Sequence, residues 1–239
     1  MALSNRYPKP IAAANPKSPV TEAYRMIRTN LQFAGVAEET KVILVTSSEP
    51  GEGKTSTICN LAIVTAQSGK RVLLLDADLR KPQVHQRFEA SNLDGLSNLL
   101  IQERKLDQCV LHSGIPNLFL LPSGPIPPNP SEMLASKGFA DLIQWARSEF
   151  DYVYIDAPPV LAVTDALILT RIADGTVLVV DAQHTNRNFA QKAVGMLQQV
   201  EARILGVVLN RVPRKSEGYY YYYYDAGIKA GARASAEGR

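Results

Sequence analysis

The chain has 239 residues, of which 46% are hydrophobic and 21% are charged. This length and composition suit one globular α/β domain with short tails and exclude wholesale disorder. The net charge of +3 is too small to predict binding to nucleic acid, and Cys59 and Cys109 are too few for a disulfide framework.

Residues 1–17 contain three prolines and little periodicity, which predicts an N-terminal extension. Ser18-Pro19 is typical of a helix N-cap followed by proline, and we expect a helix to about Ala34. The later apolar runs are too short to span a bilayer, so we expect a cytoplasmic protein with reduced cysteines.

Apolar strand candidates then alternate with amphipathic segments. The strand candidates are Val42–Thr46, Arg71–Asp76, Asn117–Leu121, Tyr152–Asp156, Thr176–Asp181 and Ile204–Leu209. Helical patterns cover Lys54–Ser68, Ser131–Phe150, Asp165–Arg171 and Asn186–Val200. This order predicts an α/β fold with a doubly wound, mostly parallel sheet over residues 18–217, which binds ligands at the carboxyl ends of its strands. Residues 218–239 are predicted to form a flexible tail.

A glycine-rich segment, Pro50-Gly51-Glu52-Gly53-Lys54-Thr55-Ser56, follows the first strand and opens a helix. This is the context of a Walker A phosphate-binding loop, in which Lys54 reaches the β- and γ-phosphates and Thr55 ligates Mg²⁺. Ser48 stands where the consensus has glycine or alanine. A strand-to-helix turn without a ligand is the simpler alternative, but Gly-Lys-Thr in this context favours nucleotide binding.

Two further strands end in aspartates at the same edge of the sheet. Asp76 ends one strand candidate and is followed by Asp78, and Asp156 ends another. Aspartates after strands are also common as turn formers and N-caps. Beside a phosphate-binding loop, they instead suit phosphoryl transfer, which needs carboxylates to hold a metal and to orient or deprotonate a hydroxyl.

Together these motifs resemble the bacterial tyrosine kinases of capsule and exopolysaccharide synthesis, from Ser18 to Tyr224. The family pattern combines a Walker A motif, a DxDxR motif and a DxxP motif. The resemblance implies a P-loop fold like that of the partition and division-site ATPases, with ATP and Mg²⁺ as cofactors. It implies phosphate contacts from Lys54, metal ligation by Thr55, Asp78 and Asp156, and hydroxyl activation by Asp76 with Asp78.

The resemblance also reaches the first predicted helix, where Glu22, Arg25 and Arg28 match an ExxRxxR motif that supports ring-shaped oligomers such as octamers. Residues three apart form one slanted row on a helix, so these side chains could meet a neighbouring subunit together. An ordinary solvated helix face is the alternative. Asn210, after the last strand, lies where related folds contact adenine, although a lone asparagine there is as often a turn residue.

Six consecutive tyrosines occupy the predicted tail: Tyr219, Tyr220, Tyr221, Tyr222, Tyr223 and Tyr224. Core packing does not explain them, because strands alternate faces and tails have no core. In the resembled family such a run is the autophosphorylation site, reached by a neighbouring molecule. An aromatic tail used for nonspecific contacts is the alternative.

Two other classes of function remain open. ATPase switches of the deviant-Walker class carry a signature lysine five residues before the phosphate-binding lysine, where this chain has Glu49. A nucleotide-binding module without catalysis is not excluded by sequence. The family resemblance further implies protein-tyrosine substrates and a transmembrane modulator protein that recruits the kinase to the inner face of the membrane.

Overall fold

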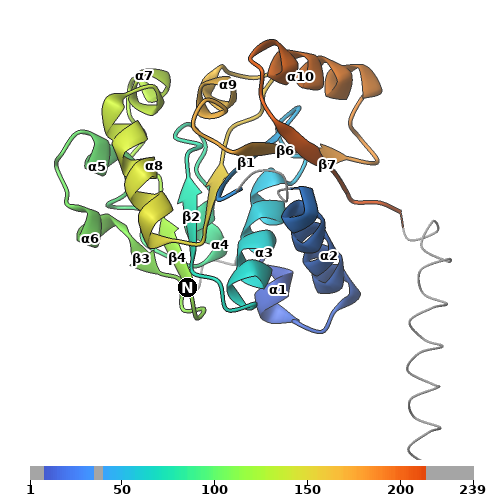
Figure 1. Ribbon diagram of the computed structural model, residues 1–239, viewed down its shortest axis with the longest axis horizontal. Helices are drawn as coiled ribbons and strands as arrows, with labels where there is room; N and C mark the ends of the chain where they lie inside the picture. Colours follow the sequence, from blue (N-terminus) through green and yellow to red (C-terminus); the bar gives the residue numbers. More distant parts are fainter. Residues whose placement is uncertain (1–7, 35–39, 214–239) are drawn as a thin grey trace, which may run out of the picture.

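The computed structural model describes residues 8–34 and 40–213, in which strands and helices alternate around one sheet (Figure 1). The strands are β1 (Val42–Ser47), β2 (Val72–Asp76), β3 (Leu111–His112), β4 (Leu118–Leu121), β5 (Tyr152–Asp156), β6 (Gly175–Asp181) and β7 (Ile204–Asn210). The longer helices are α2 (Pro19–Ala34), α3 (Lys54–Ala66), α8 (Lys137–Glu149) and α10 (Arg187–Gln199). The shorter ones are α1 (Ile11–Ala14), α4 (Val84–Arg87), α5 (Leu96–Leu100), α6 (Leu106–Cys109), α7 (Pro130–Leu134) and α9 (Asp165–Leu169).

The sheet has the strand order β3-β4-β2-β5-β1-β6-β7. Every neighbouring pair is parallel except β3 with β4. Parallel neighbours require crossover connections, which the helices provide. The predicted doubly wound, mostly parallel sheet is therefore confirmed. In this register Asp156 is paired with Val45 on one side and with Asp76 on the other, so the strands end together.

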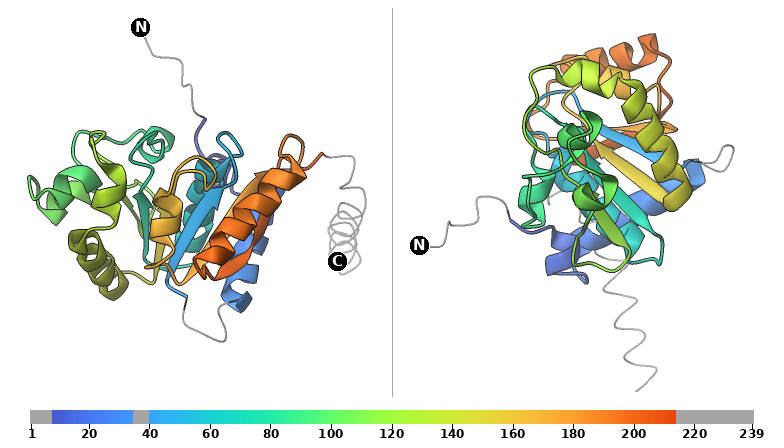
Figure 2. Two further views of the ribbon diagram at one scale, coloured as in Figure 1. Left: turned by 90° about the horizontal axis from the view of Figure 1, so that it is seen from above. Right: turned by 90° about the vertical axis from the view of Figure 1, so that its left-hand side faces the viewer.

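Alternate residues of the central strands belong to two separate hydrophobic cores. Val42 and Leu44 join the core beneath α8, α9 and α10, whereas Ile43 and Val45 join the core beneath α1, α2 and α3. Figure 2 shows these helices on the two faces of the sheet. Strands buried on both faces read as continuous apolar runs, which is why their sequences do not alternate.

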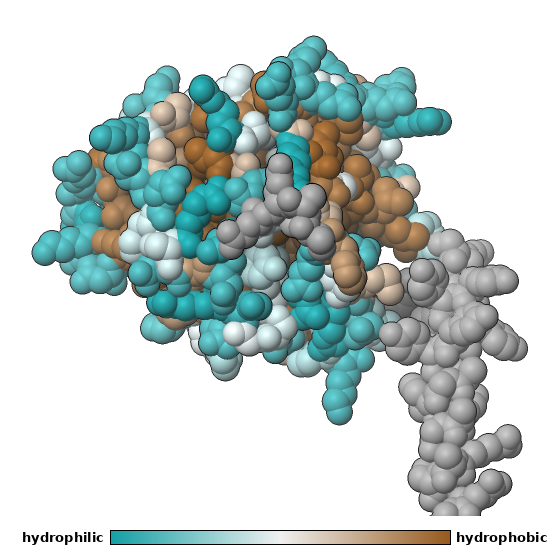
Figure 3. All heavy atoms as spheres, in the orientation of Figure 1, coloured by the Kyte–Doolittle hydropathy of each residue, from teal (hydrophilic) through white to brown (hydrophobic). Residues whose placement is uncertain are grey.

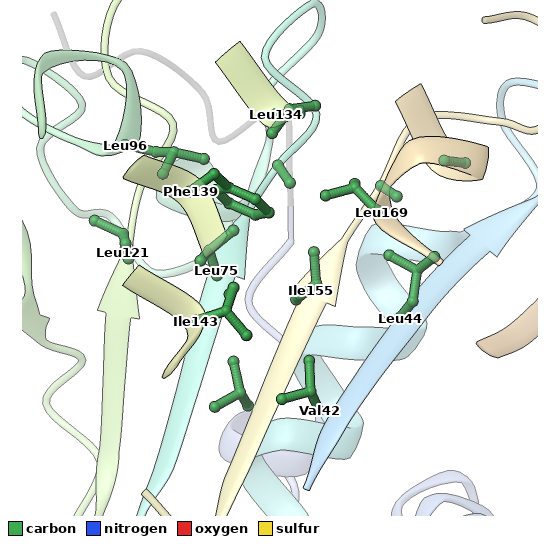
Figure 4. Packing of buried hydrophobic residues seen from close by; sticks show 14 of the residues in the cluster. Val42, Leu44, Leu75, Leu96, Leu121, Leu134, Phe139, Ile143, Ile155 and Leu169 are labelled. Carbon is green, nitrogen blue, oxygen red and sulfur yellow. The ribbon is translucent and has the colours of Figure 1, made fainter. Parts of the chain in front are cut away.

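The core beneath α8 is well filled in the region that supports the site. Figure 4 shows Phe139 and Ile143 of α8 over Leu75 of β2 and Ile155 of β5. Each of these four side chains is at most 1% exposed, and burial of one such side chain contributes about 1.5–3 kcal/mol. The strands that carry the site aspartates are thus fixed on a packed layer.

One predicted helix is wrong in its extent. The pattern over Ser131–Phe150 predicts a single helix, but α7 ends at Leu134 and α8 begins at Lys137. Ser136 separates them because its Oγ accepts a hydrogen bond from the N–H of Phe139, 3.2 Å away, and so caps a new helix.

Several short elements were not predicted. They include β3 and the helices α1, α4, α5 and α6, which have two to five residues each. Helix α1 lies in the predicted extension, yet Ala12 is fully buried and donates its N–H to Asn60 Oδ1 of α3 at 2.8 Å. Segments this short have too few residues for a periodic pattern.

Asp174, just before β6, joins three parts of the fold. Its carboxylate accepts the N–H groups of Lys41 and Val42 at 2.8 and 2.7 Å, and it pairs with Arg147 of α8 at 2.7 Å. Partial burial opposes ionisation of Asp174, but the hydrogen bonds from Arg147 and the two N–H groups outweigh it and lower its pKa. This carboxylate therefore stabilises the start of β1.

The outer edge of the sheet leaves apolar side chains at the surface. Val207 and Leu209 of β7 are 50% and 62% exposed, and Figure 3 shows a hydrophobic area over this edge. None of the helices within residues 8–34 and 40–213 combines the length and apolarity that crossing a membrane requires.

Candidate active site

The phosphate-binding loop connects β1 to α3 at the carboxyl edge of the sheet. Gly51 and Gly53 have φ angles of +87° and +94°, a region that glycine adopts without strain. A Cβ on Gly53 would lie 2.1 Å from Nδ2 of Asn210, which donates to the carbonyl of Glu52 at 2.9 Å. Gly53 is therefore required both by its backbone angle and by the asparagine that packs over it.

Lys54 and Thr55 face the two aspartate-bearing strands. The Lys54 Nζ lies 2.8 Å from Asp78 Oδ2 and 3.4 Å from Asp156 Oδ1. The Thr55 hydroxyl donates to Asp156 Oδ2 at 2.6 Å. The structure thus brings together in one group four side chains that the sequence predicted separately, from the loop and from the ends of β2 and β5.

Burial and the neighbouring charges have opposite effects on the pKa values of Lys54 and Asp156. Burial opposes the charge on Lys54, but the attraction of Asp156 and Asp78 outweighs it, and the pKa of Lys54 is raised. Burial raises the pKa of Asp156, although Lys54 and the Thr55 hydroxyl partly offset this effect. The lysine ammonium is therefore held charged between carboxylates, where a second cation would also be attracted.

Asp76 is fully buried beneath the surface of the site. It is 0% exposed, and its carboxylate accepts the N–H groups of Gln83, Val84 and Asp78 at 3.0, 2.9 and 3.3 Å. Burial, together with the charge of Asp156, raises the pKa of Asp76 to about 8. Of the DxDxR aspartates, it is Asp78 that lines the cleft.

A cleft of about 420 Å³ opens above this group. Its lining comes from the phosphate-binding loop, the segment after β2 and the loop after β5: Pro50, Gly51, Gly53, Lys54, Thr55, Ser56, Asp78, Arg80, Lys81, Gln83, Arg87, Pro158, Pro159, Ala162 and Val163, with Arg211. A volume in this range suits a ligand of nucleotide size.

Arg80, the last residue of the DxDxR segment, is fixed by a buried carboxylate. Its Nε and Nη2 donate to Asp165 at 2.8 and 3.1 Å, and Ser131 Oγ donates to the same carboxylate at 2.7 Å. Asp165 is 0% exposed at the start of α9. This bidentate contact ties the segment that carries Asp78 to α7 and α9.

A second cleft of about 340 Å³ adjoins the first and shares Pro50, Gly51 and Arg211 with it. Glu52 lies at its border, where its carboxylate accepts the N–H of Glu49 at 2.9 Å and the hydroxyl of Thr185. Figure 1 shows β6 and β7 ending beside the loop after β1. The second cleft is thus a continuation into which a nucleotide base could extend.

Comparison with known proteins identifies the family. A family model described as an AAA domain matches residues 40–207. The tyrosine-protein kinase YwqD of Bacillus subtilis is 46% identical over 217 residues, which cover 90% of this chain and 92% of that protein. The chain belongs to the bacterial tyrosine kinases. It is accordingly a protein-tyrosine kinase built on a P-loop nucleotide-binding domain.

Solved structures agree with this assignment. The chimerical protein CapA2B2 has 39% identity and a TM-score of 0.83, covering 85% of the kinase described here and 90% of its own chain. The kinase domain of the Escherichia coli tyrosine kinase ETK has 34% identity and a TM-score of 0.80, with coverage of 85% and 81%. A septum site-determining protein MinD, with 23% identity and a TM-score of 0.63, shares the fold.

The oxygen ligands of the site fit a magnesium ion. Thr55, Asp78 and Asp156 supply a hydroxyl and two carboxylates, and Mg²⁺ commonly takes one or two carboxylates together with substrate phosphates. No group of three or more His, Cys, Asp or Glu residues in the described part of the kinase forms a metal cage. A hydroxyl and two carboxylates leave coordination positions of the ion for phosphate oxygens and water.

The remaining predicted residues lie away from this group or outside the described residues. On α2, Arg25 pairs with Glu22 at 2.8 Å, and Arg28 donates to the carbonyl of Val64 at 2.9 Å. The Asn210 side chain packs against Gly53 and donates to the carbonyl of Glu52. The run Tyr219–Tyr224 lies outside the described residues.

Several residues that shape the site were not predicted from the sequence: Asp165, Ser131, Asp181, Thr185 and Arg211. Asp181 ends β6 as Asp156 ends β5, and it accepts Arg211 Nη1 at 2.5 Å, so the same strand-end rule would have found it. Asp165 gave no such signal, because its partner Arg80 is 85 residues away in sequence.

Proposed function

We propose that the kinase binds ATP with Mg²⁺ in the cleft and phosphorylates the run Tyr219–Tyr224 of a neighbouring copy. The observation that supports this most directly is a group of four side chains at the strand ends, joined by contacts of 2.6 to 3.4 Å: Lys54, Thr55, Asp78 and Asp156. Phosphoryl transfer depends on positioning and charge stabilisation, which such a group supplies.

Each residue of the group has a proposed role. Lys54 and the N–H groups of the loop bind the phosphates, with Gly51, Glu52, Gly53 and Ser56 contributing backbone or side-chain contacts. Thr55, Asp78 and Asp156 hold the metal. When bound, Mg²⁺ neutralises charge that develops on the phosphate oxygens.

Hydroxyl activation is assigned to Asp76 and Asp78 acting as a pair. Asp78 lines the cleft and meets the incoming tyrosine, while Asp76 lies behind it and accepts the Asp78 N–H at 3.3 Å. In the transfer, the bond between the tyrosine oxygen and the γ-phosphorus forms, and the bond to the β-phosphate oxygen breaks. The hydroxyl proton passes to the Asp78 carboxylate, which lines the cleft, and ADP leaves.

The cellular role follows from the family resemblance. We propose that the kinase regulates exopolysaccharide or capsule synthesis, that a transmembrane modulator protein recruits it to the inner face of the membrane, and that it forms a ring through Glu22, Arg25 and Arg28.

These α2 side chains are partly exposed. Light scattering of the purified protein tests the ring: E22A/R25A/R28A should reduce the molar mass to that of a monomer, and an unchanged mass contradicts this assignment.

Transfer between copies can be tested with two full-length variants. One carries K54M and keeps its tyrosines, and the other keeps Lys54 but has phenylalanine at positions 219–224. Mixed with Mg²⁺ and ATP, only the K54M chain should gain phosphate, and it should gain none when incubated alone. Phosphate-free tails in the mixture, with wild-type tails still modified, would contradict transfer between copies.

A further inference from the structure

The mouth of the nucleotide cleft has a marked excess of positive charge. Its lining contains five basic side chains and one acidic side chain: Lys54, Arg80, Lys81, Arg87, Arg211 and Asp78. A cleft with such an imbalance raises the local concentration of anionic ligands. A cation that already pairs with a carboxylate is less available to a ligand than one without such a partner.

Three of these cations already have carboxylate partners at 2.8 Å or less: Asp78 for Lys54, Asp165 for Arg80 and Asp181 for Arg211. Arg87 donates to the carbonyl of Pro8 at 3.4 Å. Lys81 is exposed, and its ammonium forms no ion pair with any residue in the ranges 8–34 and 40–213. Lys81 is thus a rim cation that remains for a ligand.

The backbone of Lys81 is fixed beside the acceptor side of the site. Its N–H donates to Asp78 Oδ1 at 3.0 Å, and Pro82 follows it. A residue before proline is restricted to extended conformations. Its side chain therefore starts next to the carboxylate assigned to the incoming hydroxyl, and little backbone entropy is lost when it binds an anion.

Part of the lining of the same cleft is apolar. Pro158, Pro159, Ala162 and Val163 line it, and the hydroxyl of Thr46 holds the Pro158 carbonyl at 2.7 Å. An apolar wall suits the face of an aromatic ring. The lining of this one cleft therefore combines an apolar surface for a tyrosine ring with the Lys81 cation.

We propose that Lys81 binds the phosphate of a phosphotyrosine two residues from the acceptor tyrosine, so that a partly phosphorylated tail is a better substrate than an unmodified one. This inference rests on the proposed function, because it takes the tyrosine run as the substrate. It adds that the first phosphate promotes the next.

The tyrosine run can present an acceptor and a phosphotyrosine on the same side of an extended chain. In an extended chain, side chains two residues apart lie on the same side, about 6.5–7 Å from each other. A phosphotyrosine carries about −1.5 to −2 charges and accepts strong hydrogen bonds from an ammonium group. Glu217 and Asp225 flank the run, so weaker anions are present before any phosphate is added.

Two synthetic peptides test the proposal, both spanning residues 215–227, one unmodified and one with phosphotyrosine at Tyr222. The full-length wild type, K81A and K192A are compared on both, where Lys192 is an exposed lysine on α10. We expect wild type and K192A to favour the phosphopeptide in kcat/KM by roughly three- to tenfold, the size of one partly exposed charged contact. K81A should reduce this ratio to about one, and K81E should invert it.

The possible results distinguish a failure of this inference from a failure of the proposed function. Equal kcat/KM values on the two peptides with wild type, or a preference that K81A leaves intact, would overturn the role of Lys81 and leave tail phosphorylation standing. If wild type phosphorylated neither peptide nor its own tail, the proposed function would fail as well. A preference lost equally in K81A and K192A would show only a general effect of charge and would also overturn the assignment.

Discussion

The contact between Arg80 and Asp165 gives a sharp test of how the fold positions the site. Asp165→Asn keeps the size of the side chain but removes the charge that holds the guanidinium at 2.8 and 3.1 Å. Arg80 would then lose the partner that fixes the segment carrying Asp78. The expected result is a kinase that folds and binds nucleotide but transfers phosphate slowly.

The magnitude follows from the burial of the two partners. Breaking a fully buried ion pair costs about 3–5 kcal/mol. Asp165 is buried, but the Arg80 side chain is 39% exposed, so water can replace part of the lost interaction. We therefore expect a loss of about 1–3 kcal/mol in the free energy of unfolding. A displacement of about 1 Å at Asp78 would lower kcat roughly 100-fold.

Urea denaturation followed by circular dichroism measures the first effect, and initial rates of tail phosphorylation measure the second. Asp141→Asn, at an exposed position on α8, is the matched control and should change neither quantity. Ser131→Ala removes one hydrogen bond to the same carboxylate and should cost about 0.5–1.5 kcal/mol. Wild-type kcat and stability in D165N would refute the reasoning.

Two further predictions concern backbone strain and pH. Gly53→Ala should abolish nucleotide binding, measured by calorimetry, because φ is +94° and the new Cβ lies 2.1 Å from Asn210 Nδ2. Gly195→Ala on α10, with nothing within 4 Å, should instead stabilise the fold by roughly 0.5–1 kcal/mol. Asp174→Asn should cost about 2 kcal/mol at neutral pH. Because the folded-state pKa of Asp174 lies below the ordinary value of 3.8, the difference from wild type should persist above that value and shrink as pH falls through the lower folded-state pKa. A difference independent of pH between 7 and 3, or nucleotide binding by G53A, would contradict these accounts.

The sequence predicted the parts of the fold that repeat a pattern. The apolar runs at Val42–Thr46 and Tyr152–Asp156 became β1 and β5, because strands buried on both faces need unbroken apolar sequence. The loop from Gly51 to Thr55 was recognisable because its glycines and lysine have fixed spacing. Short elements such as α1 carry no such period, and they were missed.

The site was predictable where its residues follow strands, and not where they meet by packing. Asp78 follows β2 and Asp156 ends β5, so strand order alone places them at one edge. The complete burial of Asp76 depends on tertiary packing, because the backbone N–H groups of Gln83 and Val84 fold back to donate to its carboxylate. The pairing of Arg80 with α9 likewise depends on how distant segments pack.

The central claim is that the phosphate-binding loop serves a kinase whose substrate is its own tail. The most direct test incubates the purified full chain with Mg²⁺ and ATP, with and without a modulator segment, and examines residues 215–239 by mass spectrometry. Phosphate on Tyr219–Tyr224 in wild type, with none in a folded Lys54→Met variant, is the predicted result. ATP hydrolysis without phosphotyrosine under both conditions would contradict it and would indicate an ATPase switch.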